Sequence, residues 1–356
     1  MTNRFPFKNL VFQGGGIKTF VYHGALEVLD EYEILTQIER VAGTSAGAIL
    51  AMLVSFRLSA RETVEILRQV EYTKIPGTKT GQLPEWAHRV PLPEQQVTWL
   101  MERMDTLSRL YRTYGWYTHD YAYQWLIEII ARHCQGNGRA TFADFRAKGF
   151  RDLYIPAANL STHQVTYFCA DATPEVAVAD AVLMSATLPL FFEALQFDGK
   201  QFGQGDYYAD GGLVANFPLQ LFDAPKYVPS SRHYLHGVNW ETLGCRIYTP
   251  PDCPPISRPI TNLLTYMQNL VETLGMAQDV AFETSLVDQM RTININDCCV
   301  SVTEFDVRPS EDDPKYRALF ASGREAAQTY LEQYRLPTDR FYDLKAKFAE
   351  FLAQWR

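Results

Sequence analysis

The chain has 356 residues, of which 47% are hydrophobic and 21% are charged, and its formal net charge is −8. These proportions are those of a folded globular protein and exclude wholesale disorder. The negative charge argues against an overall electrostatic grip on a nucleic-acid polymer or on an anionic membrane. We find neither an apolar run long enough to span a bilayer nor a secretory leader ahead of the first glycines, and we therefore expect a cytoplasmic protein.

The six cysteines predict no metal site. They form no C-x-x-C pair, and the adjacent Cys298 and Cys299 suit neither a zinc site nor an ordinary disulfide framework. We interpret all six as free thiols in a reducing compartment. We also expect no cofactor.

Two strand-to-helix units open the chain. The apolar run 10–12 leads into three glycines, and 20–29 continues with the apolar spacing of a packed helix. The run 40–42 leads into a second glycine-containing turn, and 48–56 is again an apolar helix. Two such units in succession predict an α/β fold with a largely parallel sheet.

The rest of the chain is expected to complete one domain. Prolines and aromatics crowd residues 71–138, which we interpret as a mostly helical insertion in a catalytic core spanning 8–225. Residues 226–356 are predicted to complete that core and to add a helical appendix. Further strands are expected over 152–158, 164–170 and 291–302, and further helices over 176–186, 261–290 and 313–356.

The pattern Gly43-x-Ser45-x-Gly47 is typical of a nucleophile elbow. A serine on a tight strand-to-helix turn needs glycine on either side, because side chains there would be crowded. The turn exposes the hydroxyl at the start of the following helix. An ordinary helix N-cap, in which the serine hydroxyl binds backbone amides, explains the pattern equally well when it is taken alone.

Gly14-Gly15-Gly16, followed by Lys18, is the second pattern. Three glycines after a strand leave successive backbone N–H groups uncovered, as an oxyanion hole requires, and Lys18 adds positive charge. The sequence has neither the G-x-G-x-x-G spacing of a dinucleotide-binding fingerprint nor the G-K-[ST] ending of a phosphate loop. A simple turn that begins a helix remains an alternative interpretation.

Asp210-Gly211-Gly212 is the third pattern. Two glycines after an aspartate let a ligand approach its carboxylate closely. An isolated Asp-Gly, however, is also common in surface turns.

Taken together and in this order, the three patterns resemble the patatin-like phospholipase family. The resemblance covers about residues 8–225 and departs at Thr19, where the family usually has glycine. It implies a three-layer α/β/α sandwich with a largely parallel central sheet. Further matching stretches are Gly24-Ala25-Leu26, residues 185–192 and Asn216-Phe217-Pro218.

The resemblance implies a two-residue catalytic dyad with Ser45 as nucleophile and Asp210 as base. Gly14, Gly15, Gly16 and Lys18 would form the oxyanion hole, and no histidine would take part. Of the seven histidines, His23 is expected to be structural, and the others lie outside any catalytic pattern: His88, His119, His133, His163, His233 and His236.

The implied substrates are fatty-acyl esters of phospholipids or lysophospholipids, met at a membrane surface to which the protein binds peripherally. The insertion is either an acyl-chain wall or lid, with Arg103, Arg109 and Arg112 on a basic and apolar helix, or a cap packed on its own core. An acyltransferase that uses the same acyl-enzyme and a catalytically silent binding protein are the alternatives. Some members of the family need a protein or nucleotide activator, and some are injected effectors. No feature of this sequence indicates either property or an oligomeric state.

Overall fold

The computed structural model describes part of the chain. Arg103 and Arg109, 12 of the 30 residues of the helix predicted over 261–290, and the end of the helix predicted over 313–356 lie outside the described residues. The described residues are 5–77, 110–228, 233–253, 260–261, 265–266, 269–270, 273, 278–280 and 282–335.

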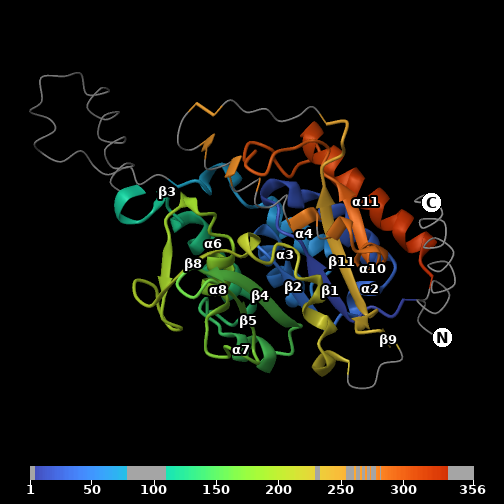
Figure 1. The fold of residues 1–356 in the computed structure, drawn as a ribbon, viewed down its shortest axis with the longest axis horizontal. Helices are drawn as coiled ribbons and strands as arrows, with labels where there is room; N and C mark the ends of the chain where they lie inside the picture. Colours follow the sequence, from blue (N-terminus) through green and yellow to red (C-terminus); the bar gives the residue numbers. More distant parts are fainter. Residues whose placement is uncertain are drawn as a thin grey trace, which may run out of the picture.

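An eight-stranded sheet forms the centre of the molecule (Figure 1). Its order is β12-β11-β1-β2-β4-β8-β7, and β5 also pairs with β4. The five strands from β12 to β4 run parallel, whereas β5, β7 and β8 run antiparallel to their neighbours, so the predicted, largely parallel sheet is confirmed. The strands are β1 (Asn9–Phe12), β2 (Arg40–Gly43), β4 (Asp152–Asn159), β5 (Gln164–Phe168), β7 (Leu195–Phe197), β8 (Asp206–Asp210), β11 (Thr242–Tyr248) and β12 (Thr292–Asn296).

Helices and short 3-10 turns flank this sheet. The helices are α1 (Val21–Glu31), α2 (Ile34–Gln37), α3 (Ala46–Ser55), α4 (Ala60–Arg68), α6 (Asp120–His133), α7 (Phe142–Ala147), α8 (Val178–Ser185), α10 (Leu286–Met290) and α11 (Pro314–Gln333). The 3-10 turns are η1 (Gly16–Phe20), η2 (Tyr72–Lys74), η4 (Gly211–Leu213), η5 (Leu219–Asp223) and η6 (Pro225–Tyr227). Two small two-stranded sheets pair β3 (Gly115–Tyr117) with β6 (Leu190–Phe192) and β9 (Tyr234–Leu235) with β10 (Val238–Asn239).

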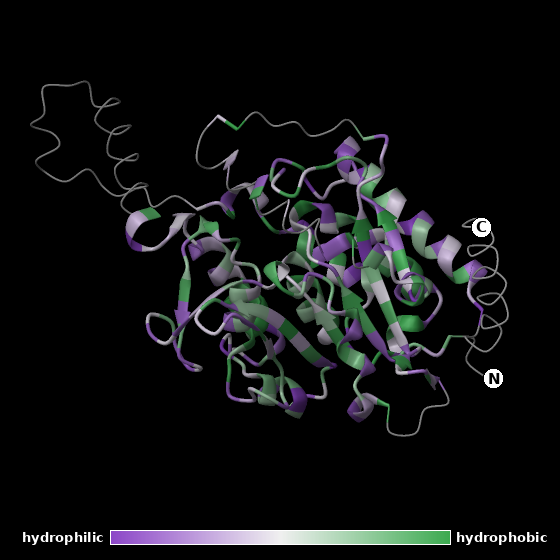
Figure 2. Ribbon diagram, in the orientation of Figure 1, coloured by the Kyte–Doolittle hydropathy of each residue, from purple (hydrophilic) through white to green (hydrophobic). Residues whose placement is uncertain are grey.

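The two faces of the sheet are covered differently. Because side chains alternate along a strand, Leu10 and Phe12 of β1 enter the main core, whereas Val11 points to the other face. The main core includes the buried faces of α1, α3, α8 and α11, and Figure 2 shows hydrophobic residues along the central strands and these helices. On the other face, η5 and η6 cover Val11 with Leu219, Phe222 and Tyr227.

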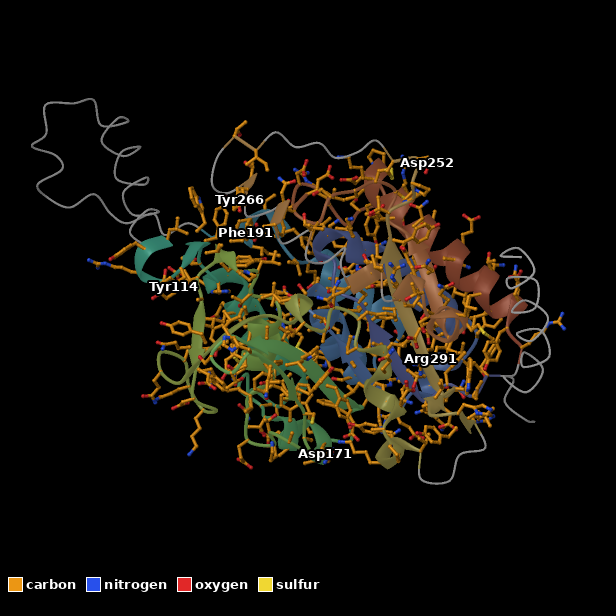
Figure 3. The ribbon with its side chains drawn as sticks, in the orientation of Figure 1. Tyr114, Asp171, Phe191, Asp252, Tyr266 and Arg291 are labelled. Carbon is orange, nitrogen blue, oxygen red and sulfur yellow. A yellow bond between two sulfur atoms is a disulfide. The ribbon has the colours of Figure 1, made fainter. Side chains whose placement is uncertain are left out.

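A buried ion cluster fastens that second face. Arg291, just before β12, is almost fully buried (Figure 3). Its guanidinium donates to Asp223 of η5 at 2.6 Å and to Asp288 of α10 at 2.7 Å. Two carboxylates around one guanidinium compensate its burial, and the cluster joins η5 to the segment between α10 and β12, 68 positions later.

Helices α1 and α11 pack backbone to backbone. A Cβ atom on Gly323 of α11 would overlap the carbonyl oxygen of Val21, and one on Gly24 of α1 would overlap that of Phe320. Tyr316 and other residues of α11 belong to the main core. Helix α11 therefore packs directly on α1, the helix that follows the glycine loop.

This close approach makes Gly323→Ala destabilising. We expect the added methyl to force the helices apart and to lower the free energy of unfolding by roughly 1–3 kcal/mol. Urea denaturation followed by circular dichroism measures the change. Thr329→Ala, at an exposed position of the same helix, is the matched control, and equal midpoints for the two variants would contradict the packing.

Candidate active site

Ser45 lies on the turn between β2 and α3. Its backbone adopts φ 55° and ψ −128°, which is rare for a residue with a side chain. The turn is so tight that a Cβ atom on Gly43 would overlap the carbonyl oxygen of Gly47. The Ser45 side chain makes no capping hydrogen bond to α3, so the N-cap interpretation of this serine is wrong.

The Ser45 hydroxyl instead donates to Asp210, with 2.6 Å between Oγ and Oδ2. The register of the sheet explains this meeting. Ala42 of β2 pairs with Tyr154 of β4, so position 45, three residues on, falls level with Ala157, which pairs with Asp210 of β8. The two residues thus lie at one level on either side of β4.

Asp210 is 2% exposed, and its second oxygen accepts the Gly212 N–H at 2.7 Å. Burial raises the pKa of Asp210 to about 7, against the opposing effect of the hydrogen bonds from Ser45 and Gly212. Among the described residues, no basic side chain pairs with this carboxylate. A carboxylate with a near-neutral pKa, hydrogen-bonded to a serine hydroxyl, can act as a general base.

The glycine loop lies beside the serine, since a Cβ atom on Gly14 would be 3.0 Å from that of Ser45. The Gly14 N–H already donates to the Asn216 carbonyl at 3.1 Å, so Gly14 is not a free donor. Within the described ranges, the N–H groups of Gly15 and Gly16 have no acceptor. Two of the three predicted glycine donors are therefore available to an oxyanion.

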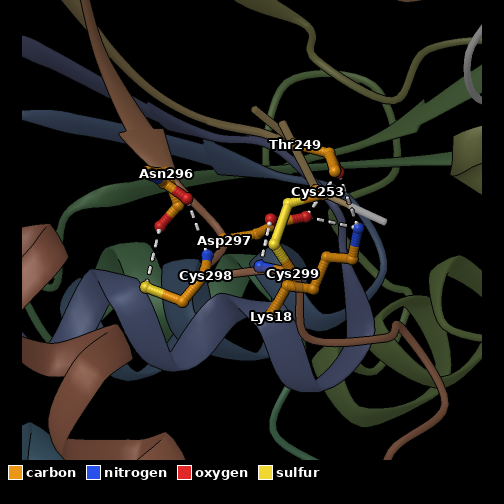
Figure 4. Close-up of a disulfide and its surroundings, with 7 residues drawn as sticks. All are labelled: Lys18, Thr249, Cys253, Asn296, Asp297, Cys298 and Cys299. Atoms are coloured by element: carbon orange, nitrogen blue, oxygen red, sulfur yellow. Dashed lines mark hydrogen bonds and ion pairs between the residues drawn. A yellow bond between two sulfur atoms is a disulfide. The ribbon is translucent and has the colours of Figure 1, made fainter. Parts of the chain in front are cut away.

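Lys18 is occupied elsewhere. Its ammonium pairs with Asp297 Oδ2 at 2.7 Å and lies 3.3 Å from the Thr249 hydroxyl (Figure 4). The Asp297 side chain is fully buried and the Lys18 side chain is 16% exposed. Because its charge is already balanced, Lys18 is not a free cation beside the oxyanion donors. It ties η1 to the loop after β12.

The same loop carries a disulfide between Cys253 and Cys299 (Figure 4). The interpretation of all six cysteines as free thiols is therefore wrong for this pair. The two cysteines are 46 positions apart, and no sequence pattern indicates that the fold brings their Cα atoms to 5.6 Å. The other four are free: Cys134, Cys169, Cys245 and Cys298.

Two polar residues at the site carried no catalytic pattern in the sequence. Ser185, at the end of α8, accepts the Ser45 N–H at 3.1 Å. The Gln278 amide accepts the Asn216 N–H at 2.9 Å and donates to the Gly212 carbonyl at 2.6 Å. Ser185 opens the stretch 185–192 that resembles the family, but only the fold shows that it and Gln278 contact the site.

Over the described ranges, no histidine bonds to Ser45 or Asp210. His23 is buried and contacts the Tyr316 hydroxyl, and His119 contacts Thr187. No cluster of three or more His, Cys, Asp or Glu residues in this part of the chain could hold a metal. Nor does any described helix have the length and hydropathy needed to cross a bilayer.

Comparison with known proteins places this geometry in context. Uncharacterized protein YqhO of Bacillus subtilis is 27% identical over 331 residues, which are 91% of this chain and 98% of that protein. A cGAMP-activated phospholipase of Pseudomonas aeruginosa is 25% identical over 64% of this chain and 60% of its own length.

Among solved structures, VipD from Legionella pneumophila matches with a TM-score of 0.52 and 16% identity, over 92% of this chain and 67% of its own. At that identity the match shows a shared fold, and it agrees with the mostly parallel sheet and flanking helices described above. The sequence model of patatin-like phospholipases matches residues 10–223, more than half of the chain and all three patterns. The chain belongs to the patatin-like phospholipase family.

Proposed function

We propose that this protein is a serine lipid acyl hydrolase that cleaves fatty-acyl esters of phospholipids or lysophospholipids. The observation that carries the proposal is the 2.6 Å hydrogen bond from Ser45 to a buried Asp210, beside two unoccupied N–H donors. Membership of the family supports the same chemistry.

In this mechanism Asp210 takes the hydroxyl proton while Ser45 Oγ attacks the ester carbonyl. The N–H groups of Gly15 and Gly16 stabilise the oxyanion of the tetrahedral intermediate, where one donor is worth about 2.7–4 kcal/mol. The intermediate collapses, and the leaving alcohol takes the proton from Asp210. Water, activated by the same carboxylate, then releases the fatty acid from the acyl-enzyme and restores Ser45.

One exposed apolar side chain lies close to the dyad in the chain. Val214, just after the Asp210 turn, is 48% exposed. An apolar group at this position suits the acyl chain of a lipid ester.

Substitution of either dyad residue tests the proposal directly. We expect Ser45→Ala and Asp210→Asn each to lower fatty-acid release from mixed phospholipid and lysophospholipid liposomes by roughly 10³-fold or more. Mass spectrometry of the lipids gives the rate, the substrate class and the acyl position. Asp171→Asn, at the surface, serves as the control. Near-native turnover by Asp210→Asn would refute the dyad.

The pH dependence follows from the base. Because Asp210 must be ionised to accept a proton and its pKa is about 7, we expect kcat/KM to fall about tenfold per pH unit below pH 7. His119, whose pKa burial lowers to about 4, titrates too low to produce this limb. Initial rates on a soluble acyl ester between pH 5 and 9 measure it, and a flat profile would count against Asp210 as the base.

The raised pKa of Asp210 also predicts that its ionised carboxylate lowers the free energy of unfolding. A carboxyl that ionises near pH 4 when unfolded and near 7 when folded favours the unfolded state as pH rises through that window. Asp210→Asn should therefore raise the free energy of unfolding at pH 8, by up to about 4 kcal/mol, and change it little below pH 4. Urea titrations at the two pH values test this, and equal gains at both would disprove it.

Two other activities are outcomes of the same assays. Acyl transfer to an added lysolipid would identify an acyltransferase, and wild-type protein that a fluorophosphonate probe fails to label at Ser45 would be a silent binding protein. Because one relative is a cGAMP-activated phospholipase, the assays include an arm with added cGAMP, and a second arm with cell extract tests for a protein activator.

A further inference from the structure

One turn receives a hydrogen bond from each dyad residue. The Ser45 N–H donates to the Ser185 hydroxyl at 3.1 Å, and the Asp210 N–H donates to the Thr187 carbonyl at 2.7 Å. Ser185 ends α8, and Thr187 follows two residues later. Both are almost fully buried.

Such a link is needed because Ser45 and Asp210 belong to strands that do not touch. β4 lies between β2 and β8, and strands two apart in a sheet are separated by about 9–10 Å. The sheet alone therefore cannot fix the dyad distance to a few tenths of an ångström. Helix α8 packs on β4, β8 and α3, so the turn at its end reaches both sides.

Ser185 accepts a hydrogen bond from Ser45, whose backbone conformation is strained. Ser45 holds φ 55° and ψ −128°, a conformation that lasts only where its surroundings fix it. The Ser185 oxygen gives the Ser45 N–H its acceptor and so opposes relaxation of the turn. Without that oxygen a buried N–H would lack a partner.

Thr187 is itself held on two sides. Its hydroxyl donates to the Leu183 carbonyl at 2.7 Å, so the 3.0 Å contact with His119 Nε2 must be donated by the histidine. This fixes the neutral Nε2–H tautomer. Burial lowers the pKa of His119 to about 4, which agrees with a neutral ring, and the ring also stacks on Phe192.

We propose that Ser185 and Thr187 are positioning residues that set the Ser45–Asp210 geometry from outside the dyad, with His119 holding Thr187. This inference rests on the proposed hydrolase function. It assigns a task to a buried serine, threonine and histidine that do not touch the reacting atoms.

The first test is Ser185→Ala. We expect kcat on a soluble acyl ester to fall about 10–100-fold, with KM within about twofold and an equal fall in the rate at which a fluorophosphonate labels Ser45. Ser55→Ala is the matched control, because Ser55 is also fully buried but its hydroxyl donates only to the Met52 carbonyl. If Ser185→Ala does not fold, Ser185→Cys keeps the shape with a weak acceptor, and the same fall in kcat is expected.

The second test separates a hydroxyl from mere volume at position 187. Thr187→Val removes the acceptor of His119 and the donor to Leu183 at equal size, and we expect a fall in kcat of about tenfold or more. Thr187→Ser keeps the hydroxyl and should retain kcat within about threefold. A purely structural role would lower the melting temperature of Thr187→Val and leave the kcat of its folded fraction unchanged, which would overturn the proposal.

The hydrolase function and the positioning role have different contradicting outcomes. If wild type neither hydrolyses esters nor labels at Ser45 in any arm, including those with cGAMP or cell extract, the hydrolase function fails. If wild type is active and both Ser185→Ala and Ser185→Cys match Ser55→Ala in kcat and labelling rate, the function stands and the positioning role is refuted.

Discussion

The hydrogen bond between Ser45 and Asp210 is the contact on which the rest of the site depends. It passes over β4, the strand that lies between β2, which precedes Ser45, and β8, which ends at Asp210. Its 2.6 Å length requires β2 to end level with β8, an elbow that turns the serine over β4, and an aspartate whose second oxygen is held by Gly212. Each requirement has a visible cause: the strand register, the close approach of Gly43 to Gly47, and the 3-10 turn η4. In the proposed mechanism no histidine is needed, because burial raises the pKa of the Asp210 carboxylate to about 7, where it can take a proton.

That same burial sets chemistry against stability. A solvated aspartate would be a weak base for a serine hydroxyl. A desolvated one is a stronger base, but its charged form destabilises the folded protein because it is buried. Within the described residues, the hydrogen bonds from Ser45 and Gly212 oppose its desolvation. The buried guanidinium of Arg291, by contrast, lies between the carboxylates of Asp223 and Asp288. The contrast fits a site where an unbalanced carboxylate serves the reaction.

The sequence predicted what depends on local spacing and missed what depends on distant contacts. Glycines around Ser45 and a second strand-to-helix unit were enough for the parallel sheet. The family resemblance that the three patterns carry implied the meeting of Ser45 with Asp210, although β2 and β8 are not neighbours and β8 runs antiparallel to β4. The disulfide of Cys299, the partner of Lys18 and the hydroxyl of Ser185 could not be predicted in this way. Each joins residues more than 40 positions apart through side chains common in any protein, and no period or spacing marks such a pair.

The residues beyond the family match hold the glycine loop in place. The Ile17 N–H, just after the two free donors, donates to the Val302 carbonyl at 3.1 Å, and Lys18 pairs with Asp297 from the same loop. Gln13, directly before the glycine loop, accepts a hydrogen bond from the N–H of Ile247 in β11 through its side-chain oxygen. An oxyanion hole stabilises charge only if its donors do not reorganise during the reaction. In the proposed mechanism, the C-terminal third would therefore contribute by holding the loop that carries the Gly15 and Gly16 N–H groups, although it contains none of the three sequence patterns.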